Sequence, residues 1–275
     1  MYKVVEKEIL APTIKKIKVE APLIARKTRP GNFIILRIDE YGERVPLTVA
    51  DYDEDSGIIT IIFQEIGFTT KKLGTLEPGD YIRDLLGPLG THLDIEGYSK
   101  VVCIGGGSGT ALLYPKVKAF HKNGAEVITI TGARSKELII LEDELKELSD
   151  KLYITTDDGS YGHHGFVTDI LKKLLEENSD IDLVVAIGPV PMMKAVTSMT
   201  PEKIKTIVSL NSLMVDGTGM CGGCRVTVGG ETKFTCVDGP AFDGHQVDFD
   251  ELTNRLSFYR EEENHVCRLD KEVNK

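Results

Sequence analysis

The sequence predicts three parts in order: an antiparallel β-barrel, an α/β domain built on a parallel sheet, and a small cysteine-bearing module. Three observations predict this fold class. Short apolar runs without long helices fill residues 1–97, strands and helices alternate over residues 98–207, and three of the five cysteines fall within residues 208–250. A charged tail, residues 251–275, completes the chain.

The composition is that of an ordinary globular protein with an acidic balance. With 275 residues, of which 41% are hydrophobic, the chain can build a large core. The formal net charge of −10 argues against a nucleic-acid partner, which favours a basic surface. No apolar run approaches the ~20 residues needed to cross a bilayer, and the N-terminus shows no signal-peptide pattern. We therefore expect a cytoplasmic protein without a membrane partner.

The first 97 residues contain short β-prone runs separated by Gly, Pro and Asp turn residues. About six strands without long helices are typical of a small closed barrel. The most regular runs are residues 3–10, 13–19, 32–38, 58–64 and 81–86.

Two stretches of this barrel carry candidate binding groups. Residues 44–48 enter a strand, and residues 63–70 lead from a strand into a short helical turn. Hydroxyls and free N–H groups at a helix N-terminus suit a diphosphate, although the threonines could simply cap the helix and the proline could mark a strand start. The candidates are Arg44, Pro46, Leu47, Thr48, Phe63, Gln64, Gly67, Thr69 and Thr70.

From residue 98 onward, strands alternate with helices. We expect strands at 101–104, 126–131, 151–155 and 183–187, with helices following each of them. Such alternation predicts a parallel sheet that binds ligands at the carboxyl ends of its strands.

Glycine-rich turns follow three of these strands and together predict a nucleotide-sized crevice. The first lacks the third glycine of G-x-G-x-x-G, where Thr110 stands, yet its N–H groups can hold a pyrophosphate. Any single turn could be only a tight turn. We expect His163 and His164 to be loop residues and expect no catalytic residue. The candidates are Gly105, Gly106, Gly107, Gly109, Thr110, Ala111, Arg134, Asp157, Asp158, Gly188, Pro189 and Met192.

The cysteines follow the spacing D-x4-C-x2-C-x11-C. Asp216 stands where the plant-type 2Fe–2S spacing, C-x4-C-x2-C, has its first cysteine, and a carboxylate can ligate iron. Four glycines between Asp216 and Cys224 fit a loop that wraps closely around a compact group. We predict a 2Fe–2S cluster ligated by Asp216, Cys221, Cys224 and Cys236.

Other uses of these cysteines remain open. A zinc site of three cysteines and an aspartate ranks second, and a redox dithiol of Cys221 and Cys224 ranks third, because these residues precede a hairpin with a Gly229-Gly230 turn instead of opening a helix. A disulfide is disfavoured by the odd cysteine count. We expect Cys103, in a buried strand, and Cys267, in the tail, to be bystanders.

The three parts in this order resemble one branch of the ferredoxin–NADP reductase superfamily over essentially the full length. The resemblance implies an FAD-binding barrel, an NAD-binding α/β domain and a C-terminal 2Fe–2S module. Two groups are similar: the electron-transfer subunit of NAD-linked dihydroorotate dehydrogenase, and the small (beta) subunit of NADH-dependent reduced ferredoxin:NADP oxidoreductase, also described as sulfide dehydrogenase.

Individual motifs carry the resemblance in the barrel. Pro46-Leu47-Thr48 match the last three positions of the R-x-Y-S flavin motif, with Arg44 one position early. The resemblance implies that Leu47 packs on the flavin ring and that Thr48 bonds near its N5 atom. Residues 67–73 resemble the diphosphate turn, and residues 87–90 resemble the motif that closes the barrel.

Two further motifs lie in the α/β domain. Residues 105–111 resemble the family's GGGxGxAP loop, and Gly188-Pro189 resembles its CGP motif, with Ile187 in place of the cysteine. The resemblance implies that NADH passes a hydride to the flavin, which passes electrons to the cluster. The implied partner is a larger flavin and iron–sulfur subunit in a heterodimer, which uses ferredoxin and NADPH and performs electron bifurcation.

Two choices complete the prediction. Asp216 favours the ferredoxin:NADP oxidoreductase branch over dihydroorotate dehydrogenase, whose motif looks all-cysteine. The alternative from another functional class is a zinc-stapled nucleotide-binding regulator. We also predict a preference for NADH over NADPH, because carboxylates at Asp157-Asp158 would accept from a ribose 2′-hydroxyl and repel a 2′-phosphate, whereas Arg134 alone favours the phosphate.

Overall fold

The structure is a computed structural model that describes residues 1–259, 261–262 and 265. Cys267 lies outside the described residues. None of the described helices is both long and apolar enough to span a membrane.

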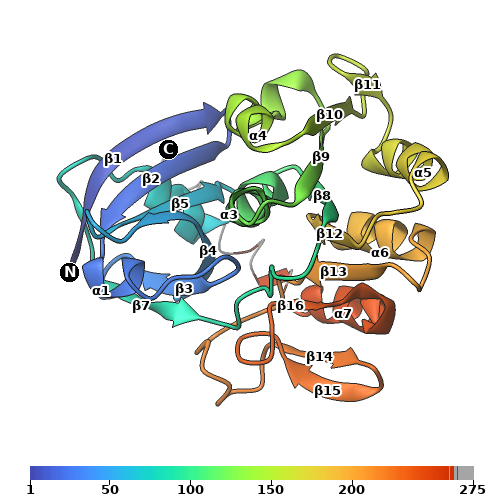
Figure 1. Ribbon diagram of the computed structural model, residues 1–275. Coiled ribbons are helices and arrows are strands. Elements are labelled where there is room, and N and C mark those ends of the chain that lie inside the picture. The colour runs from blue at the N-terminus through green and yellow to red at the C-terminus, as the bar shows by residue number, and fades with distance from the viewer. Residues whose placement is uncertain (260, 263–264, 266–275) are drawn as a thin grey trace.

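The N-terminal part is a nearly closed antiparallel barrel, at the left of Figure 1. Its seven strands follow the order β6-β1-β2-β5-β4-β3-β7. Alternate residues of β3, β4 and β5 point inward and form one apolar core. The elements are β1 (Tyr2–Ala11), β2 (Ile14–Glu20), α1 (Pro22–Ala25), β3 (Phe33–Arg37), β4 (Val45–Asp53), β5 (Ile58–Gln64), α2 (Phe68–Gly74), β6 (Tyr81–Ile82) and β7 (Asp84–Leu89).

The second part is a sheet in the order β11-β10-β9-β8-β12-β13-β16, whose first six strands are parallel. The predicted fold class is confirmed. The strands are β8 (Lys100–Gly106), β9 (Glu126–Ala133), β10 (Lys151–Thr156), β11 (His163–His164), β12 (Leu183–Ile187), β13 (Lys205–Ser209) and β16 (Ala241–Asp243). The helices are α3 (Gly109–Lys122), α4 (Glu142–Leu148), α5 (Val167–Glu177), α6 (Val190–Met199) and α7 (Phe249–Leu256), with short 3₁₀ turns η1 (Lys136–Leu138) and η2 (Gly244–Gln246).

Helices cover both faces of this sheet. Apolar residues of α3 and α4 pack on the face toward the barrel, together with Ala11, Ile14 and Ile62 of the barrel itself. Apolar residues of α5, α6 and α7 cover the other face (Figure 1). The barrel and the parallel sheet therefore share a continuous apolar interface.

The structure changes some of the expected elements. The expected helix after β9 is broken into η1 and α4, because Leu141 adopts a left-handed backbone conformation with φ 56°. His163 and His164 form the short strand β11 and not a loop. Strand β13 was not foreseen.

The domain boundaries also shift. The boundary expected after residue 207 falls inside β13, and β16 returns from the cysteine module to pair with β13 in antiparallel register. The boundary expected before residue 251 falls inside α7, whose Phe249 and Leu252 are buried. The module consists of the cysteine loop and the hairpin β14 (Arg225–Val228) and β15 (Glu231–Phe234), and its ends are built into the neighbouring sheet.

Candidate functional site

The glycine turns of the α/β domain meet at one edge of the sheet, as predicted. Gly106 at the end of β8 is in register with Gly132 of β9, and Ile187 at the end of β12 is in register with Gly105. Because β9 and β12 flank β8 on opposite sides, the strand order reverses between β8 and β12. Ligands of such sheets bind in the crevice outside this reversal point.

The turn after β8 is shaped by close approaches that exclude side chains. A Cβ atom on Gly109 would clash with the carbonyl oxygen of Ile187, and one on Gly106 would clash with the sulfur of Met192. Gly107 has φ 56°, and its N–H donates to the carbonyl of Gly132 at 2.8 Å. The β8 and β12 turns therefore pack directly against each other.

Two predicted residues of this turn face inward. Thr110 is buried, and its hydroxyl lies 2.9 Å from the hydroxyl of Thr131. Ala111 is buried in the core under the sheet. Their side chains are therefore not available to a nucleotide, and contact of a pyrophosphate with the backbone N–H groups of this turn stays a prediction.

The turns after β9 and β10 lie side by side. The backbone N–H groups of Asp157 and Asp158 donate to the carbonyls of Ala133 and Arg134, both at 3.1 Å. The Asp158 carboxylate accepts from the N–H and hydroxyl of Ser160, and these bonds hold the pKa of Asp158 below its usual value. Asp158 thus shapes the turn, whereas the carboxylate of Asp157 and the guanidinium of Arg134 are exposed.

In the barrel, the predicted flavin residues of β4 divide between two faces. Leu47 packs against the barrel core, on the opposite side from Pro46 and Thr48. Leu47 is only half-buried, and its stacking on the flavin ring stays a prediction. Arg44 is exposed.

Phe63 is the clearest departure from the predicted flavin contacts. It is only 2% exposed and lies inside the barrel core, so its side chain is structural. Gln64, the next residue, points outward and donates to the hydroxyl of Thr13 at 3.3 Å.

The start of α2 uses both of its threonines. The Thr70 hydroxyl accepts from the N–H groups of Ile66 and Gly67 at 3.0 and 3.1 Å, which is the capping role left open above. The buried Thr69 donates to the carboxylate of Glu43 at 2.9 Å. A diphosphate at this turn would contact backbone N–H groups. The Thr69 hydroxyl could bind it only by giving up its bond to Glu43, a residue that the sequence analysis missed.

The four predicted cluster ligands form two neighbouring pairs. The Sγ atoms of Cys224 and Cys236 lie 3.2 Å apart, well beyond the ~2.05 Å of a disulfide. Asp216 accepts from the N–H of Cys221 at 2.8 Å, and hydrogen bonds from Thr218 and from Cys221, including its thiol, hold the pKa of Asp216 below its usual value.

Backbone N–H groups also point at the sulfurs. The N–H of Gly223 donates to the sulfur of Cys221, and that of Cys236 donates to the sulfur of Cys224, both at 3.4 Å. Burial raises the pKa of the Cys236 thiol to about 12.

This donor set fits a binuclear centre. In a 2Fe–2S cluster each iron takes two protein ligands, which matches one pair of thiols and one pair of thiol and carboxylate. The pairing of the four residues therefore agrees with the predicted cluster.

The cysteine pair lies against the barrel face that carries the flavin candidates. Cys224 and Cys236 pack with Phe33 and Ile35 of β3. In register across the sheet, Phe33 is opposite Thr48 and Ile35 is opposite Pro46. Directly opposed residues share a face, so the two predicted sites are neighbours. Phe33 and Ile35 were missed because β3 is a continuous apolar run without alternation.

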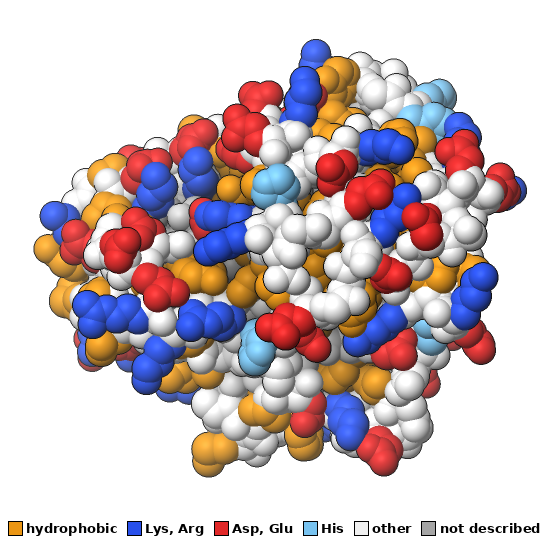
Figure 2. Space-filling model, viewed as in Figure 1, with side chains coloured by type: hydrophobic (Ala, Val, Ile, Leu, Met, Phe, Trp, Pro, Cys, Tyr) orange, Lys and Arg blue, Asp and Glu red, His pale blue; other side chains and the backbone are white. Residues whose placement is uncertain are grey.

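The loop around the cysteines presents apolar side chains to solvent. Met220 is 88% exposed and Val215 is 62% exposed. In Figure 2 several hydrophobic side chains lie at the lower edge of the face, with acidic and basic side chains beside them. Cys221, the residue after Met220, is also exposed.

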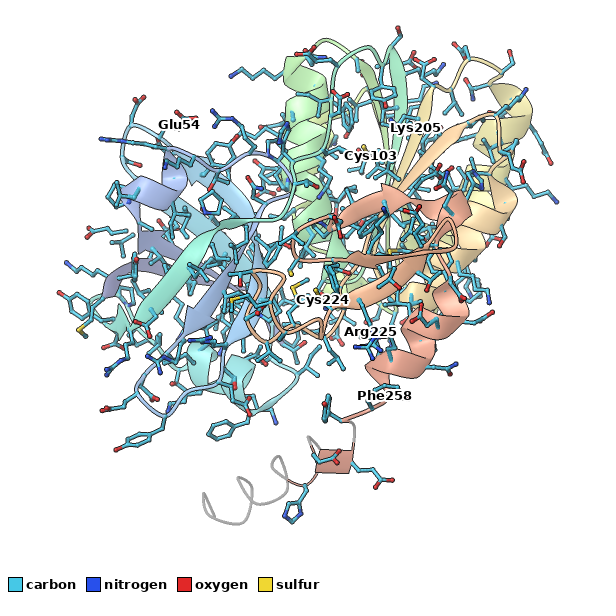
Figure 3. All side chains as sticks on the ribbon, turned by 90° about the horizontal axis from the view of Figure 1, so that it is seen from below. Glu54, Cys103, Lys205, Cys224, Arg225 and Phe258 are labelled. Carbon is cyan, nitrogen blue, oxygen red and sulfur yellow. The ribbon has the colours of Figure 1, made fainter. Side chains whose placement is uncertain are left out.

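Cys103 is separate from this site. It is fully buried in β8, and Figure 3 shows it in the α/β domain, away from Cys224. The prediction that it is a bystander agrees with this position.

Comparisons with known proteins match the three parts. Residues 103–198 match the model of the oxidoreductase NAD-binding domain, and residues 211–248 match the iron–sulfur cluster binding domain of dihydroorotate dehydrogenase B. These matches cover the glycine turns and all four predicted cluster ligands.

Similar full-length proteins extend these matches. A Thermotoga maritima protein named as a homolog of the electron transfer subunit of dihydroorotate dehydrogenase B (NAD(+)) is 46% identical, over 96% of this chain and 93% of its own. The electron transfer subunit named from Fusobacterium nucleatum is 34% identical, over 88% and 95%.

A solved structure is also similar over the whole length. It belongs to the NADH-dependent reduced ferredoxin–NADP oxidoreductase, described as giving insights into flavin-based electron bifurcation, and is 43% identical with a TM-score of 0.93. The alignment covers 100% of this chain and 98% of that one. These findings confirm the predicted oxidoreductase class and its cofactors, FAD, a 2Fe–2S cluster and NAD(H). The chain therefore belongs to the family of NAD(H)-dependent electron-transfer subunits that join a ferredoxin–NADP reductase-like module to the iron–sulfur domain of dihydroorotate dehydrogenase B.

Proposed function

We propose that this chain is the NADH-linked small subunit of an NADH-dependent reduced ferredoxin:NADP oxidoreductase. The observation that carries the proposal is Asp216, which occupies the place of the first cysteine and pairs with Cys221. The likeness to the chain of that enzyme over the full length supports it.

The geometry supports a single route for electrons. Residues 106–110 and 188–192 line the crevice between β8 and β12 and would hold the nucleotide. The face of Pro46 and Thr48 would hold the flavin beside the Cys224–Cys236 pair. When bound, NAD(H), FAD and the 2Fe–2S cluster would together convert the transfer of a hydride into the transfer of single electrons. The protein supplies position and burial, and the route needs no acid or base from its side chains.

The electrons would leave through the exposed side of the cysteine loop. Cys221, Met220 and Val215 lie there, and an apolar surface of this kind suits a protein partner. The partner in this proposal is a larger flavin and iron–sulfur subunit, which uses ferredoxin and NADPH and performs the bifurcation.

A second candidate is the electron-transfer subunit of dihydroorotate dehydrogenase B. Its support is the matched iron–sulfur domain and the names of several relatives. The two candidates share the route within this chain and differ in the partner.

Purification of the untagged protein from its native source separates the two. We expect a co-purifying larger subunit and NADP⁺ reduction that requires both NADH and reduced ferredoxin. Reduction of NAD⁺ by dihydroorotate in the same complex would overturn the proposal in favour of the second candidate. A colourless protein that contains zinc, without iron and sulfide, would reject both and restore the regulator hypothesis.

A further inference from the structure

Two arginines outside the ligand set hold the segment between Cys221 and Cys224. Arg225 donates from Nη1 to the carbonyl oxygen of Gly222 at 3.3 Å. Arg255 donates from Nη2 to the carbonyl oxygen of Gly223 at 3.0 Å. Gly222 follows Cys221 and Gly223 precedes Cys224, so each guanidinium group binds the backbone of a residue next to a predicted ligand.

Arg255 comes from α7, which is firmly attached to the module. Phe249 and Leu252 of α7 are buried, and the Glu251 carboxylate accepts from the N–H of Thr227 in β14 at 2.8 Å. At the N-terminus of α7, the Asp248 carboxylate accepts from the backbone N–H groups of Asp250 and Glu251. The helix is thereby fixed against the strand that begins immediately after Cys224.

The local surroundings also fix the Arg255 side chain. It lies in the last turn of α7, where the negative end of the helix dipole favours a cation. Its guanidinium carbon lies 5.6 Å from the centre of the Phe258 ring. Figure 3 shows Arg225 close to Cys224, on the side toward Phe258.

We propose that Arg255, assisted by Arg225, is a positioning residue that orders the cysteine loop and raises the reduction potential of its cluster. A centre held by three thiolates and a carboxylate is anionic and gains a further negative charge on reduction. Its potential responds to net charge and to hydrogen bonds around the ligands. Arginine stays charged at all ordinary pH values, so its field favours the reduced form.

The proposal rests on the cluster of the proposed function, and it is the same for either candidate partner. Arg255→Gln removes the charge, Arg255→Lys keeps it on a different donor geometry, and Arg26→Gln is the matched control. Arg26 is an exposed arginine that follows α1 in the barrel, so the control makes the same change in net charge.

Two measurements on the full-length protein test the proposal. The first is the cluster's reduction potential from a dye-mediated titration followed by electron paramagnetic resonance. The second is the rate at which a chelator removes iron. For Arg255→Gln we expect a more negative potential and roughly tenfold faster iron loss, since a charged hydrogen-bond donor is lost. For Arg255→Lys we expect a potential close to that of the wild type, and for Arg26→Gln no change in either quantity.

Other outcomes are equally informative. A potential and an iron-loss rate of Arg255→Gln equal to those of the wild type would overturn the proposal. If Arg255→Gln retains no cluster, Arg225→Gln decides: a potential and an iron-loss rate equal to those of the wild type would contradict the proposal. Hydrogen exchange of residues 221–224 in the apo-protein gives an independent reading and should be faster in Arg255→Gln. A wild-type protein without iron and sulfide would instead reject the proposed function.

Discussion

Thr91 binds the carbonyl oxygen of Gly239 twice, through its backbone N–H at 2.6 Å and through its hydroxyl at 3.0 Å. Thr91 follows β7, the last strand of the barrel, and Gly239 lies between Cys236 and β16. The two bonds therefore join the barrel directly to the iron–sulfur module. Gly90 reinforces the junction, because a Cβ atom there would lie 2.9 Å from the same oxygen.

Replacing Thr91 by valine should loosen this junction. The variant keeps the backbone bond and loses the hydroxyl bond, at a cost of about 1 kcal/mol. We expect faster hydrogen exchange in residues 236–240 and faster loss of iron to a chelator. Thr75→Val is the control, since the Thr75 hydroxyl also donates to a carbonyl, that of Lys72, but Thr75 follows α2 in the barrel. Equal effects of the two variants would contradict a specific role for Thr91.

The ligand set can be tested by substitution. Cys224→Ser or Cys236→Ser should lose most of the iron and sulfide, because each removes one member of the 3.2 Å pair. Cys103→Ala should keep them. Iron and sulfide content and visible absorption give the answer.

Asp216→Cys provides the sharper test of the altered motif. It should keep the cluster with a changed spectrum and potential, because a carboxylate ligand becomes a thiolate. An unchanged spectrum and potential would show that another group, such as Asp238, is the fourth ligand.

Nucleotide preference should depend on Asp157 more than on Asp158. Asp157 presents an exposed carboxylate, whereas that of Asp158 is occupied by Ser160. Asp157→Ser should reduce the preference for NADH over NADPH by about tenfold, since one repulsive charge near a 2′-phosphate is removed. The measurement is the rate of flavin reduction by each nucleotide in rapid mixing.

Asp158→Asn is the matched variant, because it removes a charge and keeps an acceptor for the turn. It should change the preference less. Equal or faster reduction of the wild type by NADPH would contradict the NADH assignment and make Arg134 the first residue to substitute.

Lys116 should limit stability at neutral pH. It is 1% exposed in α3, donates to the carbonyl of Leu112 at 3.2 Å, and burial lowers its pKa from 10.5 to about 8. Below pH 8 the Lys116 side chain is charged in both the folded and the unfolded protein. The full free-energy cost of burying this charge then opposes folding. Between about pH 8 and 10.5 only the unfolded chain is protonated, so this group makes folding more favourable as pH rises, by about 3 kcal/mol in all.

Lys116→Met should therefore unfold at a higher temperature than the wild type at pH 7. The difference should shrink by pH 10, as measured by thermal unfolding of the apo-protein at both pH values. A constant difference between the two pH values would show that packing, and not charge, causes the effect.

Local patterns predicted the elements that depend on local residues. The β-branched runs of β5 and β12 have the bounds expected from the sequence. The ligand spacing was equally local, because a single loop and hairpin carry Asp216 and the three cysteines. Strands β13 and β16 were not predicted, since each is short and is defined by pairing with a distant segment.

Side-chain direction was the harder part of the site. Phe63 and Thr110 belong to the motifs, yet both point into cores, and only the register of the strands reveals this. Arg255 and Thr91 were invisible for a related reason. Each contacts the module from a segment outside the cysteine loop: Thr91 follows the barrel-closing motif of residues 87–90, and Arg255 lies on α7.

Ser209 and Ala241 are directly opposite each other on β13 and β16. Residues 210–240 thus leave the nucleotide-binding sheet and return to it at adjacent points, as the loop of a long hairpin. Such a loop can change in length at little entropic cost to the sheet that bears it. The iron–sulfur module is therefore an insertion between two paired strands, and the strand pairing of the nucleotide-binding sheet is complete without it.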